Sequence, residues 1–225
     1  MLIGRISSGS DIEGRLSNPS PRYIEGDHVY KHLRKNEYST VTNTLVSSID
    51  YTVTDSLAFN GTQYIVTDFK PTNNTRIEID FKRTDTSGQK FLFGSRSADK
   101  QFTLGYYSTT VAYPMFGSTT GSLSDSGATA NEIHTASLGQ DGYYLDGECK
   151  KNFDTMNFTG IYNLYIGATN LAADVDSRMF VGEIYAVRLY ESEELVHEFL
   201  PAEGIQGEVG LYDLINSRFY QRQTN

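Results

Sequence analysis

Arg76-Ile77-Glu78-Ile79-Asp80-Phe81-Lys82 is the stretch that decides the fold class. Its apolar residues alternate with charged residues, which is the two-residue period of a β-strand with one buried and one wet face. Ile77, Ile79 and Phe81 are therefore expected to face a core. A strand of this kind needs partner strands and a second layer to cover its apolar face.

Short runs of β-branched and aromatic residues follow from Gly61 onward, separated by Gly, Asn and Asp. This is the pattern of successive strands and turns. Strands are expected near Gln63–Thr67, Arg76–Lys82, Lys90–Gly94, Phe102–Tyr107, Val111–Phe116, Ile133–Leu138, Gly142–Leu145, Leu164–Ala168 and Phe180–Tyr190. The sequence predicts an all-β fold, a two-sheet antiparallel β-sandwich.

Two local patterns refine this prediction. Asp146-Gly147 has the composition of a tight hairpin turn, because both residues tolerate positive φ angles. Ser192–Phe199 is the one helical candidate, since Ser192 can serve as an N-cap and Pro201 as a stop.

Composition bounds the function classes. With 225 residues and 38% hydrophobic residues the chain can build one core. A net charge of −9 weighs against a nucleic-acid partner, because a phosphate backbone needs a positive surface. Neither a polybasic patch nor a long apolar run points to a membrane. Cys149 is the only cysteine, so no intrachain disulfide forms. The start Met1–Arg5 lacks the apolar run of a secretory signal, which predicts synthesis in the cytoplasm.

The chain divides into three parts. Residues 1–22 are expected to form an extended N-terminal arm, 23–59 a linker with irregular strands, and 60–225 the sandwich domain. The arm repeats Leu2–Ser7 as Ile12–Ser17. A disordered tail is the alternative interpretation of this arm. As an anchor, the arm would act through six residues: Ile3, Arg5, Ile6, Ile12, Arg15 and Leu16.

Several motifs, in order, carry a family resemblance. They are Asn60–Thr67, Pro71–Ile79, Ile133–Leu138, Tyr143–Gly147, Phe180-x-Gly182-x-Ile184 with Leu189-Tyr190, Phe199–Ala202, and Gly210–Asp213 with Phe219-Tyr220. Together they resemble the laminin G-like, concanavalin A-like lectin domains of bacteriophage virion proteins and gut-bacterial surface proteins. The resemblance covers roughly residues 60–220 and implies a jelly-roll sandwich. Val66 and Asp68 depart from the pattern, so no ion or turn role is transferred there.

Glycosidases share this type of sandwich, so an enzyme is a further hypothesis. Laminarinase-type glucanases carry Glu-x-Asp-x-x-Glu on one strand, and retaining hydrolysis needs a nucleophile and a separate acid/base. Here Glu78 and Asp80 match, but Arg83 stands in place of the acid/base. We therefore expect no enzyme and name no catalytic residue.

The remaining reactive residues suggest structural roles. His134 resembles a histidine in the same strand of the related domains, which implies a structural hydrogen-bonding role, and Cys149 is expected to be a partly buried small hydrophobe. No metal site is expected, and no cofactor apart from calcium, which Asp174-Val175-Asp176 or Ser124-Asp125-Ser126 would hold. Solvated loop carboxylates are the simpler interpretation of both segments.

Carbohydrate binding in such sandwiches uses an aromatic platform beside polar groups. Tyr106, Tyr107 and Tyr113, next to the loop at 117–127, are the candidate residues. Tyrosines that pack on strands are the alternative interpretation.

The preferred hypothesis is a virion structural protein of a bacteriophage, located in the virion. In it the arm binds other virion proteins, and the sandwich projects as a decoration or adhesion module that contacts host glycans. A homo-oligomer is expected, with a trimer as a guess. The alternative hypothesis is a bacterial carbohydrate-binding lectin module, and a glucanase is the third.

Overall fold

β4 (Thr75–Arg83) shows the alternation that its sequence predicts. The structure is a computed structural model that describes residues 51–119 and 121–225. Ile77, Ile79 and Phe81 are fully buried, and the charged residues between them lie on the opposite face. The strand therefore separates the core from one outer surface of the molecule.

Sheet A contains β4 near its centre. The strands run in the order β11, β10, β9, β4, β15, β16, β17 and β18, while β1 pairs with β16 and β2 pairs with β15. Their bounds are β1 (Tyr51–Val53), β2 (Leu57–Asn60), β9 (His134–Gly139), β10 (Gly142–Leu145), β11 (Glu148–Lys151), β15 (Val181–Glu191), β16 (Glu194–Gly204), β17 (Val209–Asp213) and β18 (Arg218–Thr224).

Sheet B is the second layer. It runs in the order β8, β7, β6, β5, β12, β3 and β18, with β13 beside β5 and β14 beside β13. The bounds are β3 (Gln63–Val66), β5 (Lys90–Ser97), β6 (Lys100–Tyr106), β7 (Val111–Gly117), β8 (Leu123–Ser124), β12 (Tyr165–Ile166), β13 (Asn170–Leu171) and β14 (Asp174–Val175). Its strand pairs are antiparallel except β13 with β5.

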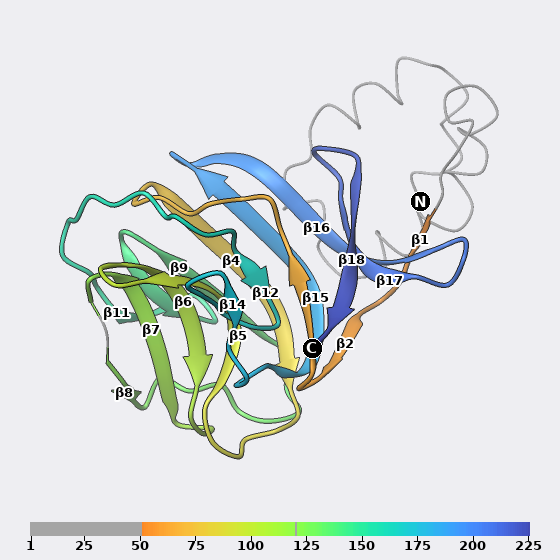
Figure 1. The fold of residues 1–225 in the computed structure, drawn as a ribbon. Helices are drawn as coiled ribbons and strands as arrows, with labels where there is room; N and C mark the ends of the chain where they lie inside the picture. Colours follow the sequence, from red (N-terminus) through yellow and green to blue (C-terminus); the bar gives the residue numbers. More distant parts are fainter. Residues whose placement is uncertain (1–50, 120) are drawn as a thin grey trace, which may run out of the picture.

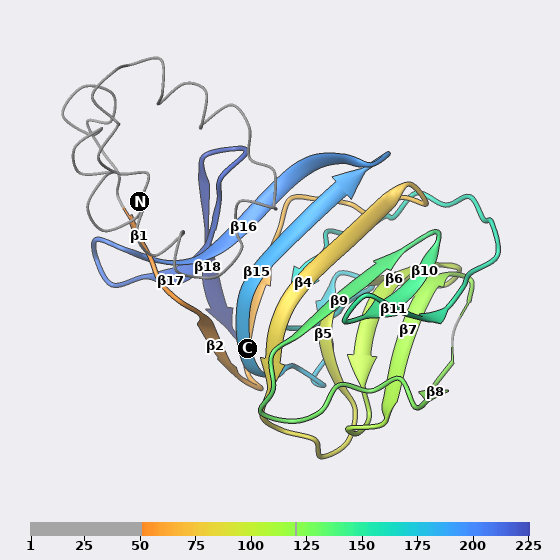
Figure 2. The same ribbon diagram turned by 180° about the vertical axis from the view of Figure 1, so that it is seen from behind.

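The two sheets pack face to face around one apolar cluster (Figures 1 and 2). Phe81 of sheet A lies against Tyr106 of sheet B, with ring centroids 5.6 Å apart. β18 belongs to both layers, because its first half pairs with β17 and its second half with β3. The expected two-sheet antiparallel sandwich is confirmed.

The expected helix at 192–199 is wrong, and the described residues contain no α-helix. Ser192 and Glu193 have φ angles of 52° and 64° and form the tight turn between β15 and β16. Two positive φ angles in sequence match the twist of a β-hairpin and prevent a right-handed helix from starting. The residues that follow pair with β15 instead, which buries Phe199.

Structure begins upstream of residue 60. β1 and β2 lie within the segment expected to be a linker with irregular strands, and Leu57 and Phe59 belong to the apolar core. The packed fold thus includes the chain from Tyr51 onward. The arm residues Ile3, Arg5, Ile6, Ile12, Arg15 and Leu16 lie outside the described residues.

Within residues 51–119 and 121–225, no helix is long and apolar enough to cross a membrane.

Candidate functional site

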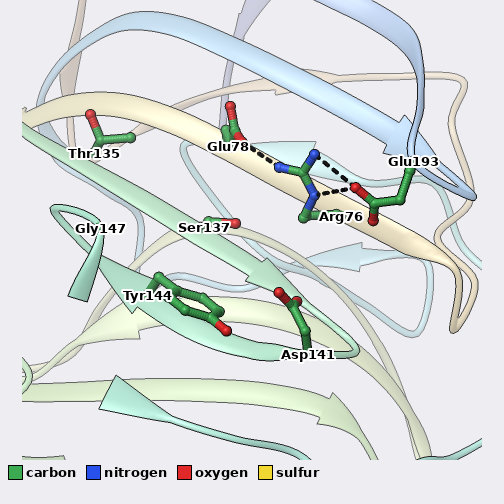
Figure 3. A pocket seen from close by; sticks show the side chains of 8 residues that line it. All are labelled: Arg76, Glu78, Thr135, Ser137, Asp141, Tyr144, Gly147 and Glu193. Carbon is green, nitrogen blue, oxygen red and sulfur yellow. Dashed lines mark hydrogen bonds and ion pairs between the residues drawn. The ribbon is translucent and has the colours of Figure 1, made fainter. Parts of the chain in front are cut away.

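An open hollow of about 390 Å³ lies on the outer face of sheet A, the face turned away from the core. It is lined by Arg76, Glu78, Thr135, Ser137, Asp141, Tyr144, Gly147 and Glu193 (Figure 3). These residues come from β4, β9 and β10 and from three turns at the ends of strands. We call this hollow the sheet A site.

Strand register places the side chains of the sheet A site side by side. Ser137 of β9 lies opposite Glu78 of β4 on one side and opposite Tyr144 of β10 on the other. Since directly opposed residues point to the same face, the three form a row across the sheet. Asp141 in the turn before β10 and Glu193 in the turn after β15 complete the rim.

Arg76 is held in a fixed position at one end of the site. Its guanidinium donates to Glu78, and Nε and Nη2 donate to Glu193 Oε2 at 3.2 and 3.1 Å (Figure 3). It also lies over the ring of Tyr190, 3.9 Å from the centroid. Burial acts to lower the pKa of Arg76, but the two carboxylates outweigh it and raise the pKa. Arg76 is therefore a cation whose charge is already compensated.

Further polar and charged side chains lie next to Arg76 and Glu78 on the outer face of sheet A. Tyr190 Oη donates to Glu78 Oε2 at 3.3 Å. Arg188, on the next outer position of β15, donates through Nη1 to Asp80 Oδ2 at 3.3 Å, and its Nε lies 3.6 Å from Glu198 Oε1. Burial raises the pKa of Glu198. These charges help to hold Arg76 and Glu78 in position, although Arg188 Nε itself has no hydrogen-bond partner.

Tyr144 supplies the aromatic surface of the site. Its ring is half-buried and lies between the two turns that carry Asp141 and Gly147 (Figure 3). The negative charge of Asp141 raises the pKa of the Tyr144 hydroxyl, so the phenol remains a neutral donor and acceptor. The site thus combines one ring face, three carboxylates and two small hydroxyl side chains.

The three tyrosines expected from the sequence do not form one platform. Tyr106 is 1% exposed, and its hydroxyl lies 3.2 Å from that of Tyr143 inside the core. Its strand alternates toward the core at this position, so Tyr106 cannot contact a ligand. Tyr107 and Tyr113 lie on the outer face of sheet B, with ring centroids 5.5 Å apart. They belong to the opposite side of the sandwich from the sheet A site.

The residues that the glucanase hypothesis used are bound in other interactions. Glu78 and Asp80 share the outer face of β4, where they contact Arg76 and Arg188. Arg83 points to the other face and is 1% exposed. It donates to the carbonyl oxygens of Ser108 and Asp85. Position 83 therefore lies on the opposite face of the strand from Glu78 and Asp80.

His134 has the hydrogen-bonding role expected for it. Its Nδ1 lies 2.7 Å from Asp146 Oδ2, and its Nε2 lies 2.8 Å from Thr129 Oγ1. These contacts tie β9 to the Asp146-Gly147 turn, whose φ angles of 53° and 80° confirm the expected hairpin. Cys149 is exposed, so the expectation of a partly buried residue is wrong. It lies on the edge strand β11, which no further strand covers within the described residues.

The acidic loop segments contain no metal cluster. Among the described residues, no group of three or more His, Cys, Asp or Glu side chains is arranged to hold a metal ion. Asp176 instead receives hydrogen bonds from the backbone and side chain of Arg178. Asp125 adopts a φ of 55° in its turn.

Most residues of the sheet A site were not singled out in the sequence. The alternation of β4 already places Arg76 and Glu78 on the outer face, and this signal was available. Glu193 was assigned to a helix, so its position beside Arg76 could not be foreseen. Tyr144 and Asp141 stand in and beside a short strand, and only the pairing of β10 with β9 brings them to Glu78.

Comparisons with known proteins relate the chain through its fold. No protein-family model and no curated protein sequence matches the chain. A putative carbohydrate binding protein from Bacteroides ovatus has a TM-score of 0.51 and 12% identity, over 76% of this chain and 60% of that one. The CBM40 module of the Ruminococcus gnavus IT-sialidase, bound to α2,3-sialyllactose, has a TM-score of 0.49 and 16% identity, over 64% and 92%. A heptameric pentraxin from Limulus polyphemus has a TM-score of 0.44 and 9% identity, over 65% and 76%. The likeness to the Bacteroides structure supports the jelly-roll assignment, and at this identity it shows the fold alone.

Proposed function

We propose that this protein is a non-catalytic carbohydrate-binding module that holds an uncharged saccharide in the sheet A site. The observation that carries the proposal is the half-buried ring of Tyr144 beside three carboxylates in one hollow. Saccharide sites combine an aromatic surface with a few polar groups fixed in place. The fold likeness to a putative carbohydrate binding protein agrees with this function and is an analogy only.

The charge of the site selects the class of saccharide. Among the described residues that line the hollow, Arg76 is the one cation, and Glu78 and Glu193 already bind it. Asp141 adds a third carboxylate with no cation in the lining. An anionic sugar would meet uncompensated negative charge, which disfavours it. Sugar hydroxyls, in contrast, donate well to carboxylates and accept from Ser137, while the hydroxyl of Thr135 already donates to Asp80 Oδ1 at 2.6 Å and remains an acceptor.

Binding of a glycan array by the full chain tests the proposal. Tyr144→Ala removes the ring, and we expect it to weaken the affinity for a bound neutral glycan by about tenfold or more, because buried aromatic contacts contribute several kcal/mol at binding sites. Tyr64→Ala is the matched control. Tyr64 stacks on Tyr165 at 5.2 Å on sheet B, so its loss removes an equal ring far from the hollow.

Two results would contradict the proposal. One is the absence of any neutral glycan ligand on the array. The other is a ligand whose affinity is unchanged by Tyr144→Ala and by Glu78→Gln, since both residues line the same hollow.

The virion role expected from the sequence receives no support from the comparisons, which favour the carbohydrate-binding alternative. The virion role stays a hypothesis that rests on the arm and on the resemblance. Deletion of residues 1–22 should abolish incorporation into particles if it is correct, and normal incorporation would refute the anchoring role.

A further inference from the structure

The outer face of sheet B carries a second cluster of binding groups, on the opposite side of the sandwich from the sheet A site. Strand register aligns Phe91 of β5, Gly105 of β6 and Tyr113 of β7 in one row. The side chain of Phe91 is fully buried, and two guanidinium groups help to cover it. Those of Arg96 and Arg178 lie 5.8 and 4.8 Å from its ring centroid. Tyr107 stands beside Tyr113 at the same edge.

The two arginines differ in how their charge is balanced. Arg178 donates from Nε and Nη2 to Asp176 and from Nη1 to Gln89 Oε1 at 2.6 Å. Arg96 donates only from Nε, to Gln101 Oε1 at 3.3 Å, and it forms no ion pair with any carboxylate in the described part of the chain. The terminal nitrogens of Arg96 thus have no hydrogen-bond partner among the described residues, and its side chain is half-buried.

The charge of Asp176 balances that of Arg96 only in part. Burial lowers the pKa of Arg96, and the positive charge of Arg178 lowers it further. Arginine nevertheless stays protonated in proteins, so the repulsion is relieved by an anion and not by loss of a proton. Tyr107 and Tyr113 pack edge to face on each other, and their hydroxyls make no hydrogen bond to the described residues.

We propose that Arg96, Tyr107 and Tyr113 form a second binding site, which takes the anionic group of an acidic saccharide. The planar fork of the Arg96 guanidinium matches a carboxylate or sulfate with two parallel hydrogen bonds. The two tyrosine hydroxyls donate to the remaining oxygens, and their rings contact the sugar. The site is distinct from the sheet A site in position and in charge, because an unpaired cation replaces the three carboxylates.

Titration of the full chain with acidic and neutral polymers tests this site. The probes are dextran sulfate against dextran, and polygalacturonate against its methyl ester, which separate sulfate from carboxylate and both from neutral sugar. We expect binding of at least one acidic polymer and none of its neutral counterpart. Arg96→Gln should weaken this binding by about tenfold or more, as expected for loss of a charge-assisted bidentate contact. Arg96→Lys should recover only part of it, because an ammonium lacks the planar fork.

Lys100→Gln is the matched control. This substitution removes one positive charge, as Arg96→Gln does, from the first residue of β6 on the same hairpin. Gln101 lies opposite Arg96, so the neighbouring Lys100 points to the other face of the sheet. The affinity of the Lys100→Gln variant for the acidic polymers should stay within about twofold of that of the wild type. Added salt should weaken the binding of these polymers by every variant. Tyr144→Ala should leave acidic binding unchanged, which separates this site from the sheet A site.

Three results would overturn the proposal: no binding of either acidic polymer by the wild type, equal losses in Arg96→Gln and Lys100→Gln, or an Arg96→Gln variant that binds as well as the wild type. Thermal unfolding of each variant identifies any loss that comes from misfolding. If Arg96→Gln unfolds at a lower temperature than the wild type, Tyr113→Phe replaces it as the test, because it removes one donor and keeps the ring. Weaker binding of the acidic polymer by Tyr113→Phe supports the proposal, and unchanged binding contradicts it.

Discussion

A tyrosine whose hydroxyl is buried has a structural role in this fold, and one whose hydroxyl faces the solvent is available to a ligand. Tyr106 and Tyr143 alternate toward the core from different sheets, and their hydroxyls meet there. Tyr143 Oη also donates to the Ser126 carbonyl oxygen at 2.9 Å. Burial raises the pKa of both phenols, so each remains neutral. Tyr144, the next residue, faces the solvent and the proposed ligand.

Removal of the Tyr143 hydroxyl should destabilise the fold. Tyr143→Phe leaves the Ser126 carbonyl and the Tyr106 hydroxyl without this partner, and an unpaired buried polar group costs about 1–3 kcal/mol. Urea unfolding measures this loss. Tyr144→Phe is the control and should change the free energy of unfolding by less than about 0.5 kcal/mol, as surface substitutions do. Equal stability of all three proteins would contradict the buried pair.

Turns between strands decide the architecture at the scale of elements. The β15–β16 hairpin is the clearest case, because it joins two strands of 11 residues each and places Glu193 beside Arg76. Ser192 and Glu193 both adopt positive φ angles there. Neither residue is the usual choice for such a turn, which favours Asn and Gly.

Substitution of Ser192 should change stability in a predictable direction. Ser192→Asn places a residue that tolerates φ of 52° at this position, and we expect a gain of about 0.5 kcal/mol. Ser192→Val should lower stability by about 1–2 kcal/mol, because a β-branched residue is strained in the left-handed region. Chemical unfolding of both variants measures the difference. A loss of stability in Ser192→Asn together with a gain in Ser192→Val would show that the turn geometry is wrong.

Two buried carboxylates, those of Asp176 and Asp213, are bound by side chains close to them in the fold. Asp176 binds Arg178 beside sheet B. Asp213, the last residue of β17, binds His197 of β16 and Asn216 in the turn before β18. Burial acts to raise the pKa of each carboxyl, but hydrogen bonds from these partners outweigh it and lower the pKa. Both groups bind protons less tightly in the folded state than in the unfolded chain.

Stability should therefore fall at acid pH. A lowered carboxyl pKa adds stability that is complete above the ordinary value near pH 4 and is lost as pH drops through the folded-state pKa. Asp176→Asn should remove about 1.5–3 kcal/mol at pH 7 and flatten the decline below pH 4. Urea unfolding between pH 2.5 and 7 compares it with Asp99→Asn, an exposed residue of the β5–β6 turn. An unchanged acid profile in Asp176→Asn would contradict the assignment.

The sequence by itself determined the fold class and much of the strand pattern. The alternation of β4 carries this information locally, because a period of two residues specifies which side chains are buried before any partner is known. The Asp146-Gly147 turn was likewise predictable from its two residues. The hydrogen-bonding role of His134 was expected from a family resemblance, and its two partners became visible only in the fold.

Tertiary structure alone decided the candidate sites. Arg76, Tyr144 and Glu193 stand far apart in the chain, and only strand register brings them to one hollow. Tyr106 and Tyr107 are adjacent in the sequence, so their side chains point to opposite faces of sheet B. Tyr106 is therefore buried in the core, while Tyr107 lies on the outer face with Tyr113. Ser192 looked like a helix cap because the same residue types favour caps and turns, and pairing with β15 chose the turn. Burial patterns are local properties of a sequence, but the meeting of side chains is a property of long-range pairing.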